Sequence, residues 1–182
     1  MKKEFDPQRL DVRRFAQEGA RLESAVPLRN WSRLFAEAEG RGGDEPVQWS
    51  AQGELVNPGH LHPQAWLHLR AGTRLQLICQ RCLNPVEINL SVDRSFRFAS
   101  DEAAAAAEDD ASEEDVLAES RSFDLVELVE DELLMAMPVV PRHERCPETL
   151  PVAAGEQEFE AAQAQRENPL KRVWLKFRPN RE

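Results

Sequence analysis

The sequence predicts an α+β fold, in which a curved antiparallel β-sheet or partly closed barrel is flanked by a few helices. Between residues 47 and 98, apolar and polar side chains alternate, which is typical of strands with one wet face. Before and after this region, apolar residues recur three and four positions apart, which is typical of helices. The connections between the predicted strands are short, and parallel strands would need a long crossover. Antiparallel pairing is therefore expected.

Two short helices are predicted before the strands. The first covers residues 6–18, with Asp6 as its cap and Pro7 at its first position, where proline loses no hydrogen bond. The second covers residues 31–38, in which the apolar residues fall at helical spacing: Trp31, Leu34, Phe35 and Ala38.

The strands follow in order. Residues 47–52 alternate in polarity, and Gly53 is expected to mark a bulge or bend. Asn57-Pro58-Gly59 predicts a turn, and the next two strands cover 64–79 and 86–98.

The negative charge of the chain is local. The net charge is −10, and nine acidic side chains with no basic one lie between residues 101 and 119. Such a stretch buries little and repels itself, so residues 100–120 are predicted to be a flexible acidic insert. It acts as a solvated linker or, alternatively, as an acidic binding segment. The remainder of the chain is nearly neutral, and no broadly basic face for nucleic acid is evident.

Residues 124–137 carry the clearest local helix signal. Asp124 is placed to cap the helix, and Glu127 stands at its third position. Phe123 and Leu128 have the spacing of a hydrophobic staple. Pro138 is expected to end the helix near Met137.

The pattern predicts a single α+β domain over residues 1–151 and a flexible tail over 152–182. A short basic amphipathic helix is expected at 169–178 within this tail. Its apolar stripe is Leu170, Val173, Trp174 and Phe177, and its basic residues are Lys171, Arg172, Lys176 and Arg178.

Two pairs of metal-ligating residues share the same spacing. Cys79 and Cys82 end a predicted strand, and His143 and Cys146 follow the proline-rich exit of the last predicted helix. Three sulfurs and one imidazole form a set that suits tetrahedral zinc. Two alternatives remain: a redox-active thiol pair, and small residues that merely pack a strand end.

The sequence offers little for catalysis. It contains no G-x-S-x-G elbow, no phosphate-binding glycine loop and no H-E-x-x-H motif. His60, His62 and His68 are expected to be surface or packing residues. No apolar run follows Lys2 and Lys3, and no window could span a bilayer, so we expect a cytoplasmic protein.

Three segments resemble one family. Residues 79–86 (CQRCLNPV) are similar to its Cys-x-Arg-Cys stretch at a strand end, and residues 124–144 are similar to its acidic-apolar helix with a proline-rich exit. Asn168-Pro169-Leu170, leading into a basic end, also matches. On these residues the chain resembles the YceD family, the bacterial large ribosomal RNA subunit accumulation proteins.

The resemblance implies a non-enzymatic factor that supports synthesis, processing or stability of 23S rRNA. The expected partner is a ribosomal protein, an assembly factor or the 23S rRNA precursor, with no small-molecule substrate and no membrane. An acidic protein approaches phosphates at an electrostatic cost, so contact is expected at a few basic or aromatic positions: Arg81, Lys171, Arg172, Trp174, Lys176 and Arg178.

Two other functions remain as alternatives. One is a zinc- or thiol-dependent enzyme that uses Cys79 and Cys82. The other, weaker alternative is a protein that binds a membrane surface through its C-terminal helix.

Overall fold

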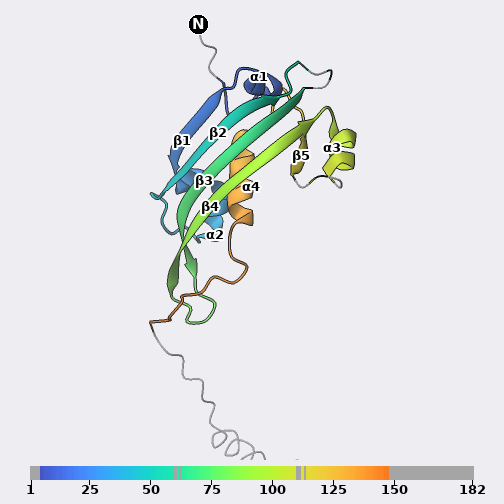
Figure 1. Cartoon of the computed structure of the whole chain (residues 1–182). Coiled ribbons are helices and arrows are strands. Elements are labelled where there is room, and N and C mark those ends of the chain that lie inside the picture. The colour runs from blue at the N-terminus through green and yellow to red at the C-terminus, as the bar shows by residue number, and fades with distance from the viewer. Residues whose placement is uncertain (1–4, 60, 62, 110–111, 113, 148–182) are drawn as a thin grey trace, which may run out of the picture. The chain divides into compact units, whose positions relative to one another are not determined.

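The computed structural model describes residues 5–59, 61, 63–109, 112 and 114–147. Their sheet has five strands in the order β1-β2-β3-β4-β5 (Figure 1). The strands are β1 (Arg21–Pro27), β2 (Pro46–Val56), β3 (Gln64–Ile78), β4 (Pro85–Ala99) and β5 (Asp115–Ala118). The first four pair antiparallel, and β5 runs parallel to β4 along the edge. The α+β class is confirmed, and the sheet is open.

The described helices are α1 (Val12–Gln17), the 3-10 turn η1 (Leu28–Asn30), α2 (Ser32–Glu37), α3 (Glu102–Asp109) and α4 (Leu125–Met135). Helices α2 and α4 lie behind the sheet in Figure 1, and α1 lies at one end of it. One sheet face is therefore covered, and the other is open.

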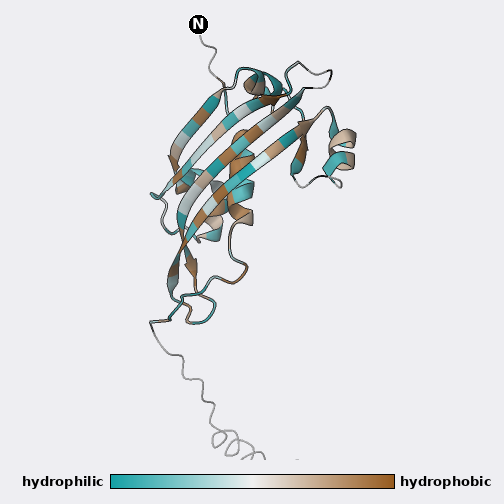
Figure 2. Cartoon of the chain, in the orientation of Figure 1, coloured by the Kyte–Doolittle hydropathy of each residue, from teal (hydrophilic) through white to brown (hydrophobic). Residues whose placement is uncertain are grey.

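The alternation predicted along the strands is what separates these two faces (Figure 2). In β3 the side chains of Leu67, Leu69 and Leu75 are fully buried, whereas Arg70 and Arg74 are exposed. Paired residues of an antiparallel sheet share a face, so the buried rows continue across the strands. An example is the row Trp49, Ala71 and Val92. The expected period of two is confirmed.

Helix α1 begins later than predicted. Its N-cap is Asp11, whose carboxylate accepts a hydrogen bond from the Arg14 backbone at 3.0 Å. Asp6 instead accepts from the Gln8 backbone in the preceding turn. Leu10 lies between them and exchanges two backbone hydrogen bonds with Phe123, which holds this segment extended rather than helical.

Gly53 does not bend β2 but allows α1 to approach it. A Cβ atom at this position would lie 2.7 Å from the Phe15 backbone oxygen and from the Phe15 ring. Only glycine fits such an approach of two backbones. The strand itself continues through Gly53 to Val56.

The acidic stretch at 100–120, predicted to be a flexible insert, forms regular structure in part. It contains α3 and the edge strand β5. Asp101 caps α3 by accepting from the Ala104 backbone at 2.9 Å, and this bond, together with one from Ser100, lowers the pKa of Asp101. The acidic composition predicted less regular structure than is present. A small apolar cluster anchors the stretch to β4: Ala99, Ala105 and Val116.

Two buried glutamates on α4 have opposite roles. Glu130 Oε1 accepts hydrogen bonds from the backbones of Arg33 at 2.8 Å and Leu34 at 3.2 Å, so it supplies the cap that α2 lacks in its own sequence. Glu132 forms a long ion pair with Arg94, in which its Oε2 lies 4.0 Å from Arg94 Nη1. Burial raises the pKa of the Glu132 carboxyl, and Arg94 offsets this only in part.

The chain divides into two units, Met1–Arg145 and Cys146–Glu182. Of the second unit, only Cys146 and Pro147 are described. The predicted tail at 152–182 and its helix at 169–178 therefore lie outside the described residues. Among the described helices, none is long and apolar enough to cross a membrane.

We predict that Glu132→Gln stabilises the protein at neutral pH by about 1 kcal/mol, the scale of a typical substitution. A raised pKa means that folding disfavours the charged form, so the ionised carboxylate costs stability above its folded pKa. The gain should vanish as the pH falls below the ordinary pKa of glutamate. Urea unfolding at several pH values measures it.

Glu130→Gln is the matched control on the same helix. It removes a charge that accepts two backbone hydrogen bonds and should lower stability by about 1–2 kcal/mol. Equal effects of the two substitutions would contradict the assigned roles.

Candidate metal centre

The turn between β3 and β4 presents two cysteines. Cys79 follows the last residue of β3, and its backbone N–H donates to the Asn84 carbonyl at 3.0 Å. The Leu83 N–H donates back to the Cys79 carbonyl at 2.9 Å, which closes the turn. The closed turn holds Leu83 in a left-handed backbone conformation, with φ 59°.

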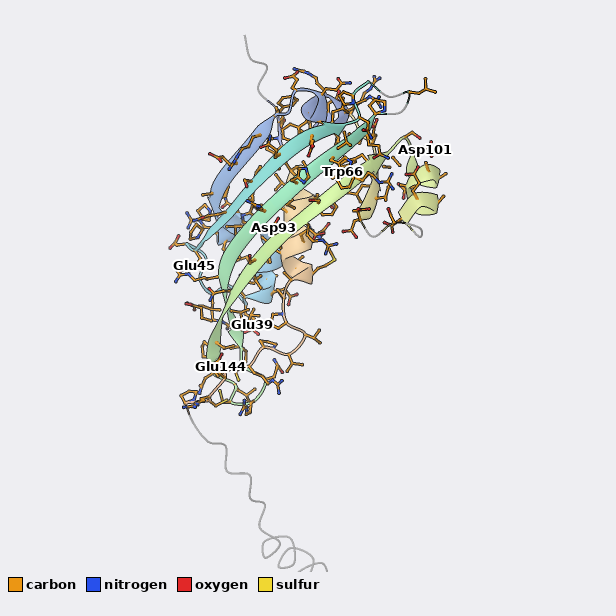
Figure 3. All side chains as sticks on the ribbon, in the orientation of Figure 1. Glu39, Glu45, Trp66, Asp93, Asp101 and Glu144 are labelled. Atoms are coloured by element: carbon orange, nitrogen blue, oxygen red, sulfur yellow. The ribbon has the colours of Figure 1, made fainter. Side chains whose placement is uncertain are left out.

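The segment after α4 returns to this turn. The Gln80 N–H donates to the Pro141 carbonyl at 2.9 Å, and the Arg81 guanidinium donates to the His143 carbonyl at 3.3 Å. Figure 3 shows this end of the molecule beside the label of Glu144. Two segments about sixty residues apart in sequence are thereby joined.

The four predicted ligands come together. Their ligand atoms all lie within 4.8 Å of one another: Cys79, Cys82, His143 and Cys146. Cys79 and Cys82 are buried, and His143 and Cys146 are half-buried. This Cys₃His cluster could hold a metal ion.

The orientation of His143 is that of a metal ligand. Its Nε2 lies 3.0 Å from the Pro85 carbonyl, which can only accept, so Nε2 carries the proton. Nδ1, the other ring nitrogen, lies 3.4 Å from Cys82 Sγ, and in the neutral ring it has the lone pair that can bind a metal. A sulfur and a nitrogen bound to one tetrahedral zinc ion lie about 3.5 Å apart. The carbonyl behind the ring is the usual second partner of a ligating histidine.

The surroundings of Cys79 lower the pKa of its thiol. Burial raises the pKa of this thiol. Hydrogen bonds with the backbones of Cys82, His143 and Arg81 and with the His143 ring lower the pKa by more than burial raises it, and the result is about 5. The thiolate is the form of cysteine that binds metals.

Only one of the residues predicted to contact RNA or a partner lies among the described residues. Arg81 is exposed on the turn between the two cysteines. Five lie outside the described residues: Lys171, Arg172, Trp174, Lys176 and Arg178. His60 and His62 also lie outside them, whereas His68 hydrogen-bonds Ser95 and Glu54 on the sheet.

No residue pattern pointed to the supporting groups of the cluster. They are the Pro85 carbonyl and the backbone amides around Cys79. Backbone N–H and C=O groups do not depend on residue type, so only the folded structure could reveal these supporting groups.

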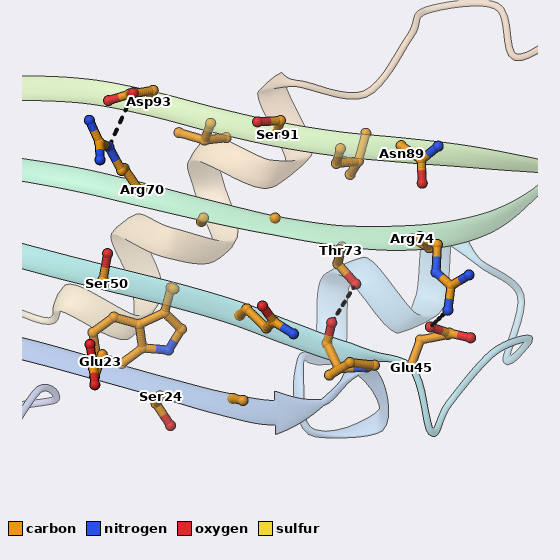
Figure 4. Close-up of a pocket in the computed structure, with 18 residues that line it drawn as sticks. Glu23, Ser24, Glu45, Ser50, Arg70, Thr73, Arg74, Asn89, Ser91 and Asp93 are labelled. Carbon is orange, nitrogen blue, oxygen red and sulfur yellow. Dashed lines mark hydrogen bonds and ion pairs between the residues drawn. The ribbon is translucent and has the colours of Figure 1, made fainter.

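The open sheet face carries a shallow hollow of about 940 Å³, away from the cysteines (Figure 4). Small residues form its floor, among them Ser50, Gly72 and Ser91. The charged residues that line it form ion pairs: Arg70 with Asp93, Arg74 with Glu45, and Glu23 with Arg21 outside it. The described part of this hollow therefore offers no free acid–base pair.

A family model described as Large ribosomal RNA subunit accumulation protein YceD matches residues 67–176. The chain belongs to this family. The match begins within β3 and includes β4, the acidic stretch, α4 and all four clustered residues, so the resemblance of the sequence is confirmed. No curated protein and no solved structure matches the chain.

We predict that Leu83→Asn stabilises this YceD-family protein by about 1 kcal/mol. Asparagine tolerates the left-handed backbone better than leucine, and the Leu83 side chain is 70% exposed, so little packing is lost. Denaturant unfolding measures the change. Leu83→Val is the control and should destabilise, because a β-branched side chain is disfavoured at positive φ. A stability loss in the asparagine variant would contradict the strain assigned to this turn.

Proposed function

We propose that this protein is a non-enzymatic, cytoplasmic factor that supports the synthesis, processing or stability of 23S rRNA. The family match over residues 67–176 carries the proposal. The protein acts by binding, and its partner is a ribosomal protein, an assembly factor or the 23S rRNA precursor.

We further propose that Cys79, Cys82, His143 and Cys146 bind one structural zinc ion. The support is the proximity of their ligand atoms and the acceptor nitrogen that His143 directs at Cys82. Three sulfurs and one imidazole complete a tetrahedral shell, which leaves no open position for substrate. The ion would join the β3–β4 turn to the segment that follows α4.

This arrangement favours a structural site over a zinc- or thiol-dependent enzyme. The Cys79 side chain is fully buried and Cys82 is 8% exposed, whereas a reactive thiol must be reached by its substrate. The membrane-surface alternative rests on residues 169–178 alone, which lie outside the described residues.

The biological role is tested in a deletion strain of the source bacterium. Loss of the protein should lower the ratio of 23S to 16S rRNA and the amount of large subunit, and the full chain should restore both. Sucrose-gradient fractions should contain the protein with large-subunit precursors. An unchanged rRNA ratio with no such association would refute the proposed role.

The zinc site is tested by metal analysis of the purified full chain. We expect an equimolar amount of zinc, and a lower melting temperature after chelation, because a metal that binds only the folded state stabilises it. Cys82→Ser and His143→Ala should lose the metal. His68→Ala, a histidine outside the cluster, should retain it. Metal-free wild-type protein whose stability is unaffected by added zinc would exclude the site.

A further inference from the structure

The arginines of the described residues fall into two groups. Most form ion pairs with carboxylates, such as Arg13 with Glu119, Arg33 with Glu130 and Arg97 with Glu108. Among the described residues, no carboxylate lies within ion-pair distance of five arginines: Arg9, Arg81, Arg121, Arg142 and Arg145.

Three of these unpaired cations belong to the loops of the Cys₃His cluster. Arg81 lies between Cys79 and Cys82 in sequence, and Arg142 and Arg145 lie on either side of His143. All three side chains are exposed. We call Arg81, Arg142 and Arg145 the arginine face.

The fold holds the two loops that carry these side chains together. The Arg81 guanidinium donates to the His143 carbonyl at 3.3 Å, and the neighbouring Gln80 N–H donates to the Pro141 carbonyl at 2.9 Å. Arg81 is thus fixed beside the segment of Arg142 and Arg145. The exposed carboxylates that the structure describes on these segments are Glu144 and Glu87, so the three arginines outnumber them in a chain of net charge −10.

We propose that the arginine face binds the phosphate backbone of RNA. The inference rests on the proposed function and names the contact surface for it. Guanidinium groups bind phosphate through paired hydrogen bonds, and a cation without a carboxylate partner gives up no ion pair when phosphate binds. An acidic protein needs such a local site, because its remaining surface repels RNA.

This surface is distinct from the basic tail that the sequence favoured for RNA contact. It lies within the unit Met1–Arg145 and next to the proposed metal ligands. A metal bound to the four proposed ligands would hold the backbone of the neighbouring arginines in place.

The test is fluorescence anisotropy with the full chain and a labelled transcript of large-subunit rRNA. A variant with Arg81, Arg142 and Arg145 all changed to Gln should bind at least about tenfold more weakly. The dependence of log K on log salt should become shallower by about 2, since each lost contact to single-stranded RNA contributes about 0.7. The corresponding Lys variant, which keeps the charges, should retain most of the salt dependence.

A matched control changes Arg9 and Arg121, the unpaired arginines away from the cluster, to Gln. It should bind within about twofold of wild type. Thermal unfolding of each variant shows that the fold is intact.

The inference is overturned if the Arg81, Arg142 and Arg145 variant binds like wild type, or if wild type does not bind the transcript. It is also overturned if only changes at Lys171, Arg172, Lys176 and Arg178 weaken binding. The 23S rRNA ratio in the deletion strain is independent of these outcomes. A normal ratio would refute the proposed function, whereas a lowered ratio without RNA binding would redirect the contact to a protein partner.

Discussion

The pairing of β3 with β4 determines where the helices pack and where the chain turns. It runs without interruption from Ala65 and Phe98 to Ile78 and Pro85. Its buried side chains, such as Leu69 and Leu75, form the floor on which the helices pack. Its far end determines where the chain turns. The two cysteines of that turn are therefore placed by the longest pair of strands in the molecule.

The Cys₃His cluster follows from this constraint together with the direction of α4. The helix ends at Met135, and proline-rich chain then leads back to the β3–β4 turn. The Pro85 carbonyl, at the start of β4, orients the His143 ring toward Cys82. Backbone N–H groups and the His143 ring lower the pKa of the buried Cys79 thiol. A zinc ion bound there would neutralise the negative charge of the thiolate.

Local interactions explain which elements the sequence could predict. Helix α4 was predictable because Asp124 caps it through a hydrogen bond to the Glu127 backbone three residues away. The grouping of Cys79, Cys82, His143 and Cys146 was predictable from the equal spacing of the two pairs. Strands β1 and β5 were missed because their short segments depend on neighbouring strands, and α1 was extended too far because the Leu10–Phe123 bridge is not visible in sequence. Glu130 as the cap of α2 is likewise a tertiary contact.

We propose above all that the Cys₃His cluster is a zinc centre, which joins the β3–β4 turn to the segment after α4. X-ray absorption at the zinc edge of the purified full chain tests it most directly. We expect a four-coordinate shell of three sulfurs at about 2.3 Å and one nitrogen at about 2.0–2.1 Å, with the nitrogen contribution lost in His143→Ala. A shell of oxygen and nitrogen ligands without sulfur, or a spectrum unchanged by that substitution, would contradict it.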